Sequence, residues 1–187
     1  MKANRLSILR PGLLWLAAFL ALLSGQGIGT ALGQSDIEMK VKAAYLLNLI
    51  KFTDWPAAKF SEEDAPVVIG CFCNAGFTQM LDRVMASKMA GGRRLVVRRV
   101  SRGEDLAGCH VLFVGAERLS AAGALLAVAR KESVLSVGES PDFLDSGGMV
   151  NFFDEQDTVH IEINPQTASR AGLTLSSRLL TVARIAR

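Results

Sequence analysis

Residues 109–138, CHVLFVGAERLSAAGALLAVARKESVLSVG, decide the fold class. Two apolar runs of strand length, Cys109–Val114 and Val134–Val137, flank a segment with helical composition that runs from about Ser120 to Lys131. Parallel strands need a long crossover connection of this kind, whereas antiparallel strands can be joined by a tight turn. The stretch therefore predicts a strand–helix–strand unit within a parallel sheet.

The same alternation continues toward the N-terminus. Val67–Phe72 is a continuous apolar run, which is typical of a strand buried on both faces, and Leu95–Val100 predicts another strand. Between them, apolar residues recur at the spacing of an amphipathic helix that ends before Gly91-Gly92. These apolar residues are Phe77, Met80, Leu81, Val84 and Met85.

Capping residues mark the remaining helices. Ser35 and Glu38 form a capping-box pattern at the start of a helix that should end before Pro56, because proline disfavours helical geometry in the residue ahead of it. Two shorter helices are predicted near the C-terminus: one from Asn164-Pro165 to Gly172, and one from Ser176 or Ser177 to near Arg187.

The C-terminal part changes character. Met149–Phe153 and Val159–Ile163 flank a polar turn, and the second run alternates apolar and polar residues, which predicts an antiparallel hairpin. Together the elements predict a single three-layer α/β domain. Its largely parallel sheet is flanked by helices and carries the hairpin at its edge.

The first 33 residues have the layout of a signal peptide. Three basic residues precede the apolar run Leu13–Leu23, which is about half as long as the roughly 20 residues that a membrane-spanning helix needs. The small residues Ala31 and Gly33 favour cleavage before Gln34. We therefore expect residues 1–33 to be removed and residues 34–187 to be exported as one domain.

Composition and charge exclude several functional classes. With 50% hydrophobic residues in 187, the chain is neither disordered nor long enough for an array of domains. The formal charge is +3, but Lys2, Arg5 and Arg10 belong to the expected signal peptide, so the exported part is neutral. A neutral domain without a predicted basic face is not expected to bind nucleic acid.

No catalytic or metal-binding pattern stands out. The two histidines, His110 and His160, lie in predicted strands, and no pair of histidines or cysteines has the spacing of a metal site. Ser176 and Ser177 have no neighbouring base in the sequence, and no nucleotide-binding glycine motif occurs. The sequence therefore predicts a protein that is not an enzyme and needs no cofactor.

Three cysteines lie in the exported part, where disulfides persist. Cys71, Cys73 and Cys109 allow one bridge and one free thiol, and counting alone does not decide whether Cys71 or Cys73 pairs with Cys109. All three also suit the role of small buried apolar residues. A C-x-C thiol oxidoreductase is disfavoured, because its reactive thiol should be exposed and this pair lies in an apolar run.

Four segments resemble the YfiR/HmsC family of exported proteins: VKAAYLLNLIKFTDWP, CHVLFVG, VLSVGESPDFLDSGGMVNFF and IEINPQTASRAGLTLSSRLLTVARI. The resemblance implies a periplasmic inhibitor of an inner-membrane diguanylate cyclase. Such an inhibitor binds the extracytoplasmic sensor portion of the cyclase and lowers cyclic-di-GMP synthesis and biofilm formation. The resemblance also implies a second partner, an OmpA-like outer-membrane lipoprotein that can sequester the inhibitor.

The resemblance further implies a redox-sensitive disulfide, which falls here on Cys71 and Cys109, and it leaves Cys73 without a role. Simple register opposes this bridge, because Cys71 lies late in its strand and Cys109 lies at the start of its own. A disulfide needs Cα atoms within about 7 Å. A second cysteine pair found in the family is absent, since no cysteine follows Cys109.

Two segments are candidates for binding partners or ligands. Phe52, Trp55 and Pro56 could form an aromatic docking patch, with a Trp55 that only fills the core as the equal alternative. Gly138-Glu139-Ser140 follows a parallel strand, where α/β sheets bind small ligands, although a plain turn before Pro141 is favoured. The alternative function is accordingly a periplasmic small-ligand receptor or solute-binding sensor. A homodimer is compatible with the sequence.

Overall fold

The structure is a computed structural model that describes residues 28–156 and 158–186. Most of the expected signal peptide lies outside these residues. Residues 28–33 are helical, because helix α2 spans Ile28–Lys51 and begins ahead of the predicted start at Ser35. Residues 28–36 contain no proline, so nothing in them prevents helical geometry.

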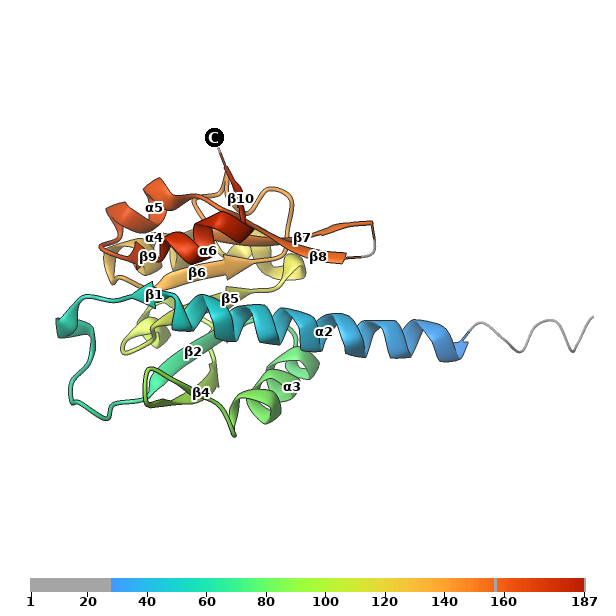
Figure 1. Ribbon diagram of the computed structural model, residues 1–187, viewed down its shortest axis with the longest axis horizontal. Helices are drawn as coiled ribbons and strands as arrows, with labels where there is room; N and C mark the ends of the chain where they lie inside the picture. The colour runs from blue at the N-terminus through green and yellow to red at the C-terminus, as the bar shows by residue number, and fades with distance from the viewer. Residues whose placement is uncertain (1–27, 157, 187) are drawn as a thin grey trace, which may run out of the picture. The chain divides into compact units, whose positions relative to one another are not determined.

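The main sheet places its strands in the order β10-β8-β7-β6-β5-β2-β4-β3 (Figure 1). The central strands β4, β2, β5, β6 and β7 are mutually parallel, β8 is antiparallel to β7, and β3 is antiparallel to β4. Their bounds are β2 Val67–Phe72, β3 Met89–Ala90, β4 Arg93–Arg99, β5 Val111–Val114, β6 Leu135–Gly138, β7 Val150–Glu155, β8 Thr158–Ile163 and β10 Arg184–Ile185. The predicted α/β class with a largely parallel sheet is confirmed.

The alternation of side chains along β5 explains the layers. Val111 and Phe113 lie in one core cluster, which includes side chains of α2 and of α3 (Ala75–Met85). Leu112 and Val114 lie in a second cluster on the opposite face, which includes side chains of α4 (Gly123–Lys131). Successive residues of a strand point to opposite faces, so a strand that is buried on both sides must be apolar throughout.

The C-terminal end differs from the prediction. Helix α5 spans Pro165–Arg170 and α6 spans Ser177–Val182, so the last helix ends before Arg187. Ala183 adopts extended geometry, and the chain continues into β10, which pairs in parallel with β8. The hairpin β7–β8 is therefore one strand away from the edge of the sheet.

A second, two-stranded sheet was not predicted. Strand β1 (Thr53–Asp54) pairs in antiparallel fashion with β9 (Thr174–Leu175). The Ser176 N–H also donates to the Phe52 carbonyl over 2.9 Å. These bonds fix the direction in which the chain leaves α2, and they place the following segment beside the C-terminal part.

The strand order also defines a switch point in the sheet. After β2 the chain adds β4 on one side, and it then crosses to the other side for β5 and β6. In doubly wound sheets, ligands bind at the carboxyl ends of the strands where the order reverses. Here that place lies between the ends of β2 and β5, close to the end of β6.

Candidate partner-binding site

The segment that follows α2 carries an aromatic group. The Trp55 indole N–H donates to the backbone carbonyl of His110 over 3.0 Å, so the ring is anchored at its inner end. Phe60 stacks on the His110 ring with 4.4 Å between centroids, and Trp55 meets His110 edge-on at 5.9 Å. The Arg93 guanidinium lies 3.9 Å from the centroid of Phe60. The aromatic rings are therefore held rigidly by partners from three parts of the chain.

His110 is the buried residue on which the rings of Trp55 and Phe60 pack. It is 3% exposed, and its Nδ1 accepts the Val68 N–H over 3.1 Å, which leaves the proton of the neutral ring on Nε2. Nε2 is buried without a hydrogen-bond partner among the described residues. Burial, followed by the positive charges of Lys59 and Arg93, lowers the pKa of His110 to about 4. The ring is therefore uncharged at neutral pH.

A pocket of about 210 Å³ opens beside Trp55. Trp55 and Phe60 form an aromatic part of its wall. The exposed side chains of Lys51 and Asp54 and the half-buried Arg93 add charges around it. A pocket with this composition suits an apolar side chain that is flanked by polar groups.

We call the predicted patch together with the pocket the Trp55 face, and we define it as Phe52, Trp55, Pro56 and the pocket. Phe52 and Trp55 are half-buried and pack against the main core, whereas Pro56 is exposed. Trp55 thus serves the core through its inner end and lines the pocket with the rest of its ring. The sequence did not indicate Phe60 or Arg93, because both approach Trp55 only through tertiary folding.

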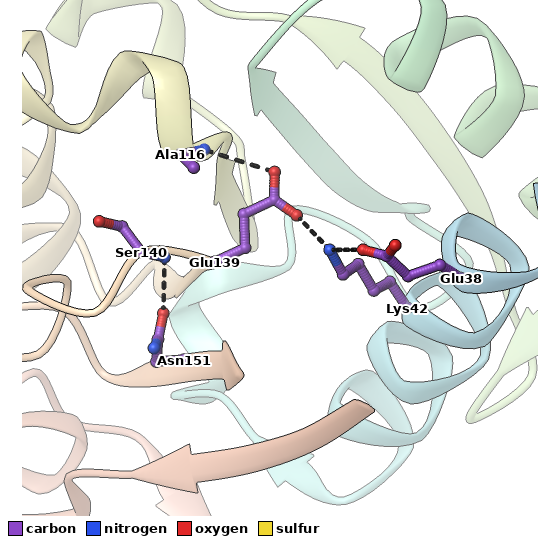
Figure 2. A network of polar contacts seen from close by, with 6 residues as sticks. All are labelled: Glu38, Lys42, Ala116, Glu139, Ser140 and Asn151. Carbon is purple, nitrogen blue, oxygen red and sulfur yellow. Dashed lines mark hydrogen bonds and ion pairs between the residues drawn. The ribbon is translucent and has the colours of Figure 1, made fainter. Parts of the chain in front are cut away.

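The predicted ligand segment lies in a polar network that Figure 2 shows at close range. Glu139 follows β6, and its two oxygens accept hydrogen bonds from the Lys42 ammonium at 2.8 Å and from the Ala116 N–H at 3.4 Å. Lys42 also pairs with Glu38, one helical turn earlier on α2. Burial lowers the pKa of Lys42, but its bonds to Glu139 and Glu38 outweigh this effect and raise it overall, so the ammonium stays charged.

The neighbours of Glu139 serve the fold. A Cβ on Gly138 would lie 2.3 Å from the Phe143 ring, so glycine is required there by close packing. The Ser140 N–H donates to the Asn151 side chain over 3.1 Å. The carboxylate that could have held a ligand is already paired with Lys42, and this arrangement favours the turn over the small-ligand pocket.

The sequence of the chain matches a known protein family over most of its length. The family model described as YfiR/HmsC-like matches residues 39–184, which cover both the Trp55 face and the Glu139 network. The chain belongs to the YfiR/HmsC-like family. Members of this family are periplasmic regulators of diguanylate cyclase signalling, and the family implies a protein partner in that signalling and a regulatory role.

Solved structures resemble the chain only in fold. A conserved domain protein from Vibrio cholerae O1 biovar eltor shares 15% identity with a TM-score of 0.49, and the match covers 64% of this chain and 54% of that one. An ABC domain in complex with L-Trp from Streptococcus pneumonia shares 12% identity with a TM-score of 0.51 and coverages of 77% and 60%. The chain thus spans little more than half the length of these structures. No curated protein matches it.

The cysteine pairing implied by the resemblance does not form in the structure. All three cysteines are free and buried. The Cα partner of Cys71 is Phe113, well beyond Cys109 in the parallel register. Cys71 also belongs to the core cluster on the α3 face, whereas Cys109 belongs to the cluster on the α4 face. A bridge would require one side chain to change face.

The structure instead brings Cys71 and Cys73 together. Both lie in the same core cluster, and the Cys73 sulfur is 3.3 Å from the Thr78 hydroxyl. A hydrogen bond with Cys71, more than any other contact, lowers the pKa of Cys73 and raises that of Cys71. Burial raises the pKa of Cys109, although Arg98 partly opposes it. Thiols this deeply buried are poorly accessible to reagents.

Among residues 28–156 and 158–186, none of the helices combines the length and the apolar character that crossing a bilayer requires.

Proposed function

We propose that the protein is a periplasmic inhibitor that binds the extracytoplasmic sensor portion of an inner-membrane diguanylate cyclase. Binding lowers cyclic-di-GMP synthesis and thereby biofilm formation. Support for the class of function comes from membership of the YfiR/HmsC-like family over residues 39–184. Support for the Trp55 face as the docking surface comes from its ordered aromatic rings, which lie beside a pocket.

One observation carries the choice of surface: a rigid aromatic wall borders an open pocket. Trp55 is fixed by its hydrogen bond to the His110 carbonyl, and Phe60 is clamped between His110 and Arg93. Side chains that are already ordered lose little conformational entropy on binding. Aromatic and arginine side chains at a pocket are also the residues that most often dominate binding energy.

The second partner is implied by the family resemblance, and we place its binding on the same surface. An OmpA-like outer-membrane lipoprotein would release the cyclase if it occupied the Trp55 face in competition with the cyclase. Redox control through Cys71 and Cys109 does not form part of the proposal, because their side chains lie on opposite faces of the sheet. The receptor alternative gains no support, since Lys42 already occupies Glu139.

The proposal is tested by cyclic-di-GMP measurement in cells. Deleting the gene should raise cyclic-di-GMP and matrix production, and the intact protein should restore the low level. The double variant Lys51→Glu with Asp54→Lys exchanges the charges at the pocket without changing the net charge, and both side chains are exposed. It should therefore fold but fail to restore the low level.

A matched control exchanges charges elsewhere. Asp82→Lys with Arg83→Glu alters two exposed residues of α3 and should complement like the intact protein. An unchanged cyclic-di-GMP level in the deletion strain would contradict inhibition. Full complementation by the pocket variant would contradict the Trp55 face as the docking surface while leaving inhibition intact.

A further inference from the structure

Strand β4 has a largely open outer edge. On its inner side it pairs with β2 over Leu95–Arg99. On its outer side β3 pairs only with Arg93 and Arg94, and no other strand of the described residues lies beside Leu95–Arg99 there. In Figure 1, β4 accordingly lies at the rim of the sheet, with α3 on one face.

The backbone of this edge is directed outward at alternate residues. The Val100 N–H donates inward to the Cys71 carbonyl over 2.9 Å. Because the direction of the peptide groups alternates along a parallel strand, Val96 and Arg98 also face β2, and Leu95, Val97 and Arg99 face outward. The outward groups form an unused ladder of donors and acceptors, which is the feature that strand addition requires.

The side chains around the edge are basic. From Arg83 to Arg102 the sequence contains no acidic residue, although the exported part as a whole is neutral. The exposed basic side chains here are Arg83, Lys88, Arg94, Arg98, Arg99 and Arg102. None of them forms an ion pair among the described residues. Val96, which is 40% exposed, lies between Arg94 and Arg98 on the strand.

Arg98 is held in place by the neighbouring loop. Its guanidinium donates to the carbonyl of Asp105 over 2.8 Å and to that of Ala107. Arg94 and Arg99 have no hydrogen bond of this kind among the described residues, so their charges are available to a partner. Guanidinium groups suit carboxylates in particular, because they can donate two parallel hydrogen bonds.

We propose that the outer edge of β4 binds an extended, acidic segment of a partner protein by strand addition. The segment would bond to the backbone of Leu95, Val97 and Arg99, and its carboxylates would pair with Arg94 and Arg99. A second copy of the protein does not pair with this edge, because the arginines of the two copies would repel each other. Charged side chains commonly protect edge strands from such pairing. The site adjoins the Trp55 face, whose pocket Arg93 lines, but it shares no residue with that face and does not depend on the identity of the cyclase.

The first test uses a defined probe. A capped eight-residue peptide with the repeat Glu-Glu-Val-Val is added to the purified protein, because Arg94 and Arg99 point to opposite faces of the strand and an extended chain of this sequence presents carboxylates on both of its faces. Amide hydrogen exchange is followed by NMR. Exchange at Val97 and Arg99 should slow roughly tenfold or more at saturation, because these amides become hydrogen-bonded. A peptide N-methylated at alternate residues keeps the charges but cannot complete the ladder, so it should give no such protection.

The second test separates recognition from general attraction. Arg94→Glu with Arg99→Glu should weaken binding of the peptide by roughly tenfold or more. The control Arg170→Glu with Arg178→Glu changes the net charge equally at exposed positions of α5 and α6 and should leave binding nearly unchanged. Equal losses in the two variants, unaltered exchange at Val97 and Arg99, or equal binding of the N-methylated peptide would each overturn the proposal.

Discussion

At the scale of the residue, His110 explains how a polar side chain can support an aromatic surface. Its Nδ1 accepts the Val68 N–H, its ring stacks on Phe60, and its carbonyl holds the indole of Trp55. The sequence predicted a structural role for His110, because the residue lies in an apolar strand. It could not predict the contacts, since Val68, Phe60 and Trp55 come from separate parts of the chain.

The burial of His110 predicts a dependence of stability on pH. Its pKa is about 4 in the folded protein against an ordinary value of 6.5. The unfolded chain therefore binds a proton between these values and the folded chain does not, so the contribution of His110 to stability is complete above pH 6.5 and is lost as the pH falls toward 4. The expected loss is roughly 2–3 kcal/mol, measured by urea unfolding at pH 7 and pH 4.

Other groups also titrate in this range, so the prediction is made as a difference between variants. His110→Asn keeps an acceptor for the Val68 N–H but does not titrate. The variant should lose less stability between pH 7 and pH 4 than the intact protein. The same loss in His110→Asn would show that His110 does not carry the effect.

At the scale of the element, α2 packs on the main core through Leu46 and Leu49, and the ion pair of Lys42 with Glu139 adds a mostly buried polar contact. Their side chains are 11% and 19% exposed, so removal of either partner leaves a mostly buried charge. Lys42→Met should reduce the free energy of unfolding by roughly 3 kcal/mol at neutral pH. Lys42→Met with Glu139→Gln should recover most of the loss, because no unpaired charge remains.

Urea unfolding of the four proteins in this cycle measures the coupling. Lys40→Met is the matched control, because Lys40 is exposed on the same helix. Its effect should be small. Strict additivity of the Lys42 and Glu139 substitutions would contradict a direct interaction between them.

Longer elements could be predicted from the sequence, and the shortest could not. The apolar run Val67–Phe72 gives the bounds of β2, and the spacing of apolar residues predicts α3. Strands β1, β3, β9 and β10 have two residues each, and only their pairing defines them. Pairing depends on tertiary contacts, which no local pattern records.

At the scale of the whole molecule, neutrality conceals an uneven distribution of charge. The exported part carries equal numbers of acidic and basic residues, yet all charged residues in the stretch from Arg83 to Arg102 are basic. The net charge alone predicts no polyanion as the general partner, but it does not describe the edge of β4. The sequence predicted part of the candidate site, namely Trp55-Pro56. It did not predict the pocket, because Arg93 and Phe60 come to lie beside Trp55 only in the folded structure.

The central claim is inhibition through the Trp55 face, and cyclase activity measures it most directly. The purified protein is added to a detergent-solubilised inner-membrane diguanylate cyclase from the same cells, and conversion of GTP to cyclic-di-GMP is followed. The account predicts that conversion falls severalfold with the intact protein and is unaffected by Lys51→Glu with Asp54→Lys. Conversion that stays the same with saturating intact protein for every membrane cyclase of the cell would contradict it.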